Sequence, residues 1–82
     1  TTFQIGIPAQ LPTDISVAHK FGIRKVNQST ELHDCGIIYY PEHPYFLCIM
    51  TKGANIQKQA LAIQELSKLT YTELDTFFKN EK

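Results

Sequence analysis

Residues 17–22 read Val17-Ala18-His19-Lys20-Phe21-Gly22, and they lie in a segment, residues 14–26, that has the composition of a β-strand. Successive side chains of a strand point to opposite faces, so Lys20 and Gly22 are expected on one face and His19 and Phe21 on the other. A lysine offers a point charge to an anionic group, and a glycine lets another chain approach the backbone closely. The first face is therefore a candidate ligand-binding surface. The same residues also fit an ordinary edge strand with a solvated lysine and a glycine bulge.

Two more segments are typical of strands. Residues 34–40 and 45–51 are rich in Ile, Tyr, Phe and Cys, and such nearly continuous apolar runs are typical of strands covered on both faces. The polar residues 27–31 are expected to form a loop, and Pro41-Glu42-His43-Pro44 a hairpin turn. Gly53 is expected to end the sheet.

The two ends of the chain have different patterns. Residues 1–13 contain one glycine and two prolines within seven positions, which predicts a connecting loop. From Ile56 the apolar residues recur with the period of a helix, and Asn55 is a suitable N-cap. A capping box can be read at Thr70-Tyr71-Thr72-Glu73, which predicts that a separate short helix starts at Thr70. The apolar stripe indicates packing against the sheet.

These elements predict an α+β fold, with a three-stranded antiparallel sheet over residues 14–53 followed by a helical region over residues 55–80. The 82 residues have room for one small domain, so residues 1–82 are expected to form a single unit. One helical layer covers only one face of the sheet and leaves the other face and at least one edge open. We therefore expect a fragment, a part of a larger assembly, or a chain that dimerises through the open face.

The composition excludes several classes of function. Eight basic and eight acidic residues cancel, and neither sign is clustered, so no nucleic-acid partner is indicated. The apolar fraction of 43% is that of a globular chain. No apolar run approaches the roughly 18 residues that span a bilayer, and the first residues lack the pattern of a signal peptide.

The two cysteines, Cys35 and Cys48, neither require nor exclude a disulfide. If Tyr40 faces Tyr45 across the turn, the thiols are diagonal neighbours, somewhat farther apart than disulfide geometry favours. We expect two buried free thiols, because buried cysteine commonly behaves as a small apolar residue. No Cys-x-x-Cys and no His/Cys cluster at ligand spacing occurs, so no metal site is expected.

The order of these segments resembles the carboxy-terminal part of the class A β-lactamases and the penicillin-binding serine hydrolases. The signature of that superfamily is Ser-x-x-Lys, Ser-x-Asn and Lys-Thr-Gly, and Lys20-Phe21-Gly22 is similar to the last motif. It is followed by Gly36-Ile37-Ile38, by an apolar strand ending in Thr51-Lys52-Gly53, and by a terminal helix. The pairs Ile7-Pro8 and Leu11-Pro12 add to the resemblance, which runs from about Ile7 to about Lys68. It covers only the last part of a family domain.

The resemblance implies substrate-binding roles around Lys20. This lysine would bind the carboxylate of a penicillin or a D-alanyl-D-alanine peptide and tune proton transfer near the nucleophile. Gly22 would let the substrate lie along the strand as an added β-segment, and the backbone amide of Ile23 would form part of the oxyanion hole. Phe21 stands in place of the Thr or Ser whose hydroxyl contacts the carboxylate, and losing such a donor costs about 1–3 kcal/mol. The ordinary alternatives are an exposed lysine, a bulge glycine and a core isoleucine.

Other family features are absent from the sequence. Cys35 stands where many class A enzymes carry an Arg that also binds the carboxylate. None of Ser16, Ser29 and Ser67 begins a Ser-x-x-Lys, and no Ser-x-Asn occurs. A serine nucleophile needs an adjacent base, so no catalytic residue is expected in these 82 residues, which should be inactive alone.

The resemblance therefore implies the C-terminal segment of a β-lactamase-like serine hydrolase that acts on β-lactams or cell-wall peptides through an acyl-serine. It implies no cofactor and a bacterial, extracytoplasmic parent that is periplasmic, secreted or surface-anchored. The expected partners are the remainder of the domain or a second copy of the chain, together with a β-lactam or peptide ligand. The alternative is a non-catalytic module that holds an extended peptide on the Lys20 and Gly22 face or on the open sheet. An unrelated small α+β domain is the third reading.

Overall fold

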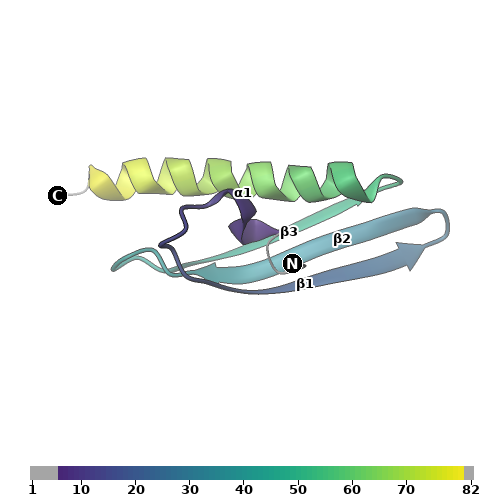
Figure 1. The fold of residues 1–82 in the computed structure, drawn as a ribbon, viewed down its shortest axis with the longest axis horizontal. Coiled ribbons are helices and arrows are strands. Elements are labelled where there is room, and N and C mark those ends of the chain that lie inside the picture. The colour runs from purple at the N-terminus through teal and green to yellow at the C-terminus, as the bar shows by residue number, and fades with distance from the viewer. Residues whose placement is uncertain (1–5, 81–82) are drawn as a thin grey trace.

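A computed structural model describes residues 6–80 of the chain. The elements in chain order are the 3-10 helix η2 (Ile7–Gln10), the strands β1 (Val17–Val26), β2 (Ser29–Ile38) and β3 (Tyr45–Gly53), and the helix α1 (Ile56–Lys79). The sheet is antiparallel with the order β1-β2-β3, and α1 lies along one of its faces (Figure 1). The predicted sheet and C-terminal helix are therefore confirmed.

The connection between β1 and β2 is a tight turn. Val26 pairs with Ser29, so Asn27 and Gln28 alone form the turn, in place of the longer loop predicted over residues 27–31. Asn27 has a φ of 57°, and two-residue hairpin turns favour positive φ, which Asn tolerates better than most residues. Consequently β2 begins at Ser29 and extends the pairing with β1.

The register between β2 and β3 differs from the prediction. Tyr45 pairs with Ile38 and not with Tyr40, because β2 ends before the segment 39–44, which contains Glu42 at a φ of 66°. This register places Cys35 directly opposite Cys48, and the two cysteines form a disulfide. The prediction of two free thiols is therefore wrong, since it assumed a tighter turn at residues 41–44.

The two faces of the sheet have different environments. Even-numbered residues of β2 point toward α1 and are buried, whereas the odd-numbered residues are less buried. The core lies between the sheet, η2 and α1 and contains Ile7, Leu11, Leu32, Ile38, Ile49 and Ile63. On the opposite face Phe46 is 68% exposed and Met50 is 69% exposed. Residues 6–80 thus cover one face of the sheet only, as predicted, and we call the other the open face.

The helix α1 is continuous, so the separate helix predicted from Thr70 does not form. The hydroxyl of Thr70 donates to the carbonyl oxygen of Leu66 at 2.8 Å, which satisfies it within the helix and leaves no capping role. Asn55 is the N-cap, as predicted, and its side-chain oxygen accepts the N–H of Lys58 at 3.0 Å.

The short helix η2 packs against α1, which holds the N-terminal end of the described residues in place. The buried hydroxyl of Ser67 donates to the carbonyl oxygen of Ile7 at 2.9 Å.

None of the helices within residues 6–80 has the length and apolar character needed to cross a bilayer.

Candidate functional site

The predicted site residues Lys20, Phe21, Gly22 and Ile23 are consecutive in β1, which is an edge strand of the sheet. Lys20 and Gly22 pair with residues of β2 that point to the open face. Phe21 and Ile23 pair with buried residues of β2 and belong to the face that carries α1. The alternation predicted for this strand is thus present, and the lysine and the glycine lie on the open face.

Within residues 6–80, no strand pairs with the outer edge of β1, which we call its free edge. The N–H of Tyr39 donates to the carbonyl oxygen of Ser16 at 2.9 Å, and the residues of an antiparallel strand alternate between those that bond to the neighbour and those that point away. Lys20 and Gly22 are separated from Ser16 by an even number of residues along the strand, so their backbone N–H and C=O groups also point toward β2. The backbone groups of Phe21 and Ile23 therefore point to the free edge, where an added strand can pair with them.

The side chain of Phe21 has a packing role. It is partly buried and contacts the hydrophobic core, and its partner across the sheet is the fully buried Asp34. Position 21 thus belongs to the face that carries α1, and its side chain supplies no hydroxyl.

Directly behind this part of β1, His19 and Asp34 form a buried pair. The imidazole Nδ1 lies 2.8 Å from each carboxylate oxygen, and the side chains are 7% and 0% exposed. Asp34 Oδ2 also accepts the backbone N–H of Ile7 at 2.8 Å. The carboxylate therefore joins β1, β2 and η2. Nothing in the sequence pattern had singled out this pair, although an aspartate inside the apolar β2 segment was an available signal.

A glycine makes room for this pair. A Cβ on Gly36 would lie 2.6 Å from the Cβ of His19 and 2.8 Å from the carbonyl oxygen of Ala18, closer than real Cβ contacts. The glycine at the first position of the motif Gly36-Ile37-Ile38 is thus required by the close approach of His19 and Ala18. The backbone of β2 must pass close to β1 where His19 turns inward.

On the open face, the residues opposite Lys20 and Gly22 are Cys35 and His33. Cys35 is bonded to Cys48, so the disulfide lies next to Lys20 on this face. The imidazole of His33 lies over Gly22. A Cβ on Gly22 would come within 2.7 Å of His33 Nε2, and nearer still to its Cε1. The close approach that the glycine allows is thus made here by a side chain of the neighbouring strand.

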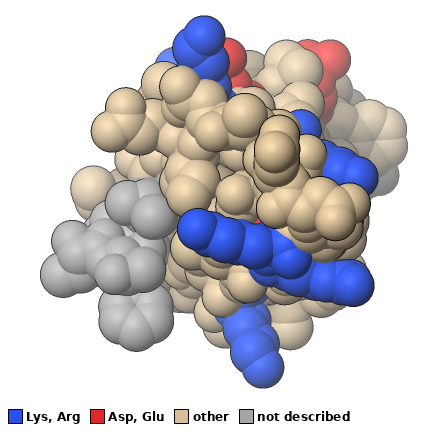
Figure 2. Space-filling view, turned by 90° about the vertical axis from the view of Figure 1, so that its right-hand side faces the viewer, with Lys and Arg blue, Asp and Glu red and all other residues tan. Residues whose placement is uncertain are grey.

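The charges near the β1–β2 hairpin are mostly positive. Arg24 and Lys25 lie in β1 and Lys52 lies near the end of β3. Arg24 is 3.9 Å from a carboxylate oxygen of Glu31, but its side chain is 72% exposed, so the pair contributes little to stability. Figure 2 looks onto this end of the molecule and shows Lys and Arg side chains close together in its lower half. The surroundings favour an anionic group.

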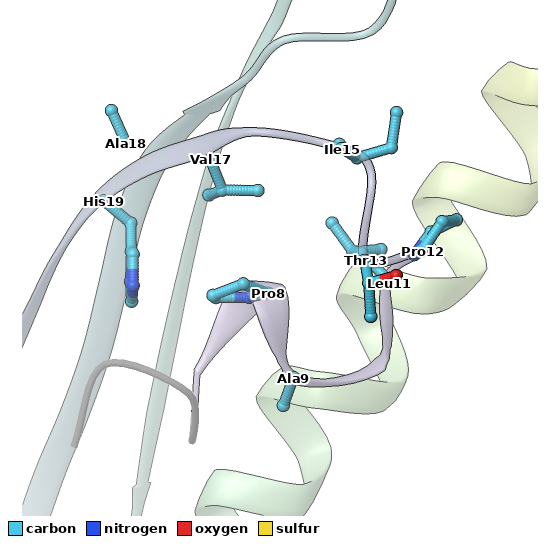
Figure 3. A pocket seen from close by; sticks show the side chains of 9 residues that line it. All are labelled: Pro8, Ala9, Leu11, Pro12, Thr13, Ile15, Val17, Ala18 and His19. Atoms are coloured by element: carbon cyan, nitrogen blue, oxygen red, sulfur yellow. The ribbon is translucent and has the colours of Figure 1, made fainter. Parts of the chain in front are cut away.

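A hollow of about 640 Å³ lies on the other side of β1, between the strand and the N-terminal segment. It is lined by Pro8, Ala9, Leu11, Pro12, Thr13, Ile15, Val17, Ala18 and His19. Figure 3 shows Val17 and His19 pointing toward the η2 segment, while Ala18 points away from it. None of the residues 20–23 lines this hollow, so it is separate from the predicted site. Within residues 6–80, no three His, Cys, Asp or Glu side chains come together as metal ligands.

A cluster of polar and aromatic side chains fastens the β2–β3 connection to α1. The Tyr40 hydroxyl donates to Asp75 at 2.6 Å, and the His43 ring stacks on Phe78 with centroids 4.2 Å apart. The hydrogen bond to Asp75, with a further effect of burial, raises the pKa of Tyr40 to about 12. The same bond lowers the pKa of the Asp75 carboxyl. These contacts join the β2–β3 connection to α1 and do not involve residues 20–23 of β1.

The chain matches a known family model and a known fold. The model described as "Beta-lactamase enzyme family" matches residues 1–74. No curated protein sequence matches significantly. A crystal structure of a representative of class A beta-lactamase from Bacteroides cellulosilyticus DSM 14838 has a TM-score of 0.76 and 24% sequence identity. The match covers 93% of this chain but only 30% of that chain. At this identity the likeness shows a shared fold.

Proposed function

The chain belongs to the beta-lactamase enzyme family, and from this premise we propose that it is the C-terminal, substrate-binding segment of a serine hydrolase. The proposed substrates are β-lactams or cell-wall peptides, which react through an acyl-serine. The nucleophile and its base come from the remainder of the domain, since the 82 residues contain no Ser-x-x-Lys. The proposal agrees with the coverage of the class A structure, because the chain spans 30% of it.

The observation that carries this proposal is the arrangement around Lys20 on an edge strand. Lys20 and Gly22 belong to the open face, while the backbone groups of Phe21 and Ile23 point to the free edge. A ligand carboxylate binds the lysine, and the ligand backbone pairs with the edge as an added strand. The Ile23 N–H then lies where it can donate to the carbonyl oxygen that gains charge during acylation.

The open face supports a larger domain. Ile37, Phe46 and Met50 are 39%, 68% and 69% exposed on one side of the sheet. Contiguous exposed apolar groups of this kind usually mark a contact surface. In the proposal, the remainder of the domain covers this face and completes the binding groove beside β1.

The disulfide supports an extracytoplasmic location for the proposed enzyme. Cys35 and Cys48 are bonded across β2 and β3, and disulfides persist mainly in oxidising compartments outside the cytoplasm. A substrate from the cell wall would be met in the same place. We therefore propose a bacterial protein that is periplasmic, secreted or surface-anchored.

Labelling with a fluorescent penicillin tests the proposal. The complete polypeptide that carries these residues should form a covalent adduct that survives denaturing electrophoresis. Lys20→Ala should slow labelling by about tenfold or more, because a hydrogen bond to a charged group is lost. Lys25→Ala is the matched control, since Lys25 is exposed on the same strand and belongs to the other face. An unlabelled wild-type protein, or equal rates for the two variants, would contradict the proposal.

The alternative function is a non-catalytic peptide-binding module. It is favoured by Phe21, which supplies no hydroxyl beside Lys20, and by Cys35, which is held in a disulfide where many class A enzymes carry an Arg. Reversible binding of a D-alanyl-D-alanine peptide without covalent labelling by the penicillin would support this alternative.

A further inference from the structure

The side chain of His33 covers the backbone of Gly22 on the open face, and we propose that it is a specificity-determining residue that binds the ligand carboxylate together with Lys20. This inference rests on the proposed function, because it concerns the same ligand and the same strand. It assigns the recognition of the anionic group to a histidine of β2, the neighbouring strand.

The position of the imidazole follows from the pairing of the strands. His33 is the direct partner of Gly22, and a Cβ on Gly22 would lie 2.7 Å from Nε2 and 3.1 Å from Nδ1 of the ring. The ring therefore occupies the space that a side chain of β1 would otherwise fill. Because His33 is partly exposed, a ligand that crosses the open face at Gly22 meets this ring.

The distance from His33 to Lys20 suits a shared anion. Lys20 is opposite Cys35, the next residue of β2 on the open face, so Lys20 and His33 are diagonal neighbours. Such neighbours are about 7–8 Å apart, within reach of long side chains. A carboxylate placed between them can accept from the lysine ammonium and from a ring N–H. Within residues 6–80, no hydrogen bond or ion pair already holds the His33 ring.

Other side chains near Lys20 are less suited to this role. Phe21 packs into the core and has no polar hydrogen, and the sulfur of Cys35 is bonded to Cys48 and has no hydrogen to donate. Arg24 belongs to the same face, but it is four residues farther along β1, about 13 Å at the spacing of a strand, and it lies 3.9 Å from a carboxylate oxygen of Glu31. His33 is therefore better placed than Arg24 to supply a second N–H beside the lysine.

The experiment compares a fluorescent penicillin with its carboxylate methyl ester on the complete polypeptide. We expect the wild-type protein to be acylated faster by the free acid than by the ester. His33→Ala should slow acylation by the acid about tenfold and leave the rate with the ester unchanged. His33→Gln retains an N–H donor and should recover part of the rate with the acid. Lys25→Ala should behave as the wild type.

The outcomes separate this inference from the proposed function. A role of His33 in packing alone would lower the thermal midpoint and change both rates equally, and that result overturns the inference. Unchanged discrimination between acid and ester in His33→Ala overturns it as well, with the proposed function intact. If the wild type is not labelled, the proposed function fails, and anisotropy with a fluorescent D-alanyl-D-alanine peptide tests His33 separately. Equal affinity of the wild type and His33→Ala, or no binding by either, overturns the inference in that case.

Discussion

The Nδ1 atom of His19 lies 2.8 Å from the carboxylate of Asp34, and this pair is buried directly behind the strand that carries Lys20. The same carboxylate accepts the backbone N–H of Ile7. One side chain of the central strand thus holds an edge strand and the N-terminal segment in place. The segment of β1 next to Lys20 is therefore anchored from the face of the sheet that carries α1.

The Asp34 carboxylate should be important for stability. Asp34→Asn removes the negative charge and puts an NH2 group in place of one of the two oxygens that contact His19 Nδ1, and an unsatisfied buried donor costs about 1–3 kcal/mol. We expect the free energy of unfolding in urea to fall by that amount. Asp14→Asn, at an exposed position before β1, is the control and should have little effect. Equal stability of the two variants would show that the pair is dispensable.

The disulfide between Cys35 and Cys48 should protect both sulfurs from alkylation and should stabilise the fold. The unreduced, denatured protein should resist alkylation at Cys35 and Cys48, and both should react after reduction. Loss of the crosslink should reduce the free energy of unfolding by about 2–4 kcal/mol, because the unfolded chain gains conformational freedom. Mass spectrometry measures the first effect and denaturant titration the second. Alkylation of the unreduced protein would restore the free-thiol prediction.

The two sheet glycines Gly36 and Gly53 should tolerate alanine differently. A Cβ on Gly36 would lie 2.6 Å from the Cβ of His19, whereas the nearest atoms to a Cβ on Gly53 belong to Gln59, at 3.7 Å. Overpacking of this kind typically costs about 1–3 kcal/mol. Gly36→Ala should therefore lower the thermal midpoint and slow penicillin labelling, while Gly53→Ala should do neither. The reverse order of stability would contradict the packing described for His19.

The hydrogen bond between Tyr40 and Asp75 should make stability fall at high pH. The bond raises the pKa of the Tyr40 phenol from 10.0 to about 12 in the folded protein. A raised pKa in the folded state means that the contribution is complete below pH 10 and is lost as the pH rises through about 12. Asp75→Asn should move the tyrosinate titration toward lower pH.

A difference spectrum isolates the titration of Tyr40. The absorbance of the wild type minus that of Tyr40→Phe removes the contribution of Tyr45, whose pKa burial also raises to about 12. The same subtraction is made for Asp75→Asn, with the double variant Asp75→Asn/Tyr40→Phe as its reference. If Tyr40 then titrates as in the wild type, Asp75 is not the cause of the raised pKa of Tyr40. That result would contradict the assignment.

Much of the fold follows from local patterns in the sequence. The alternation along β1 correctly predicted that Lys20 shares a face with Gly22 and that His19 and Phe21 belong to the other face. The N-cap at Asn55 was also correct, because Asn preceded an apolar stripe with helical period. Both features depend on neighbours in the sequence, and periodicity describes such neighbours well.

The remaining features depend on pairing between distant residues. The position at which β2 ends decides the register, so a turn placed two residues too late moved Cys48 away from Cys35. The contact of His19 with Asp34 also depends on the pairing register, here between β1 and β2, so it could not be predicted from either segment alone. The capping box at Thr70 failed for another reason, since α1 packs on the sheet and on η2 along its length and the helix continues through it.

The motif Leu32-His33-Asp34-Cys35 sends alternate side chains to opposite sides of the sheet. An insertion of a single residue before this motif would therefore exchange the two sides together, since strand side chains repeat every two residues. Asp34 would then point to the open face, and Cys35 would point to the interior. Point substitutions can alter either side of β2 separately, but changes in its length cannot. The open face of this segment should therefore vary by replacement of residues rather than by gain or loss of them.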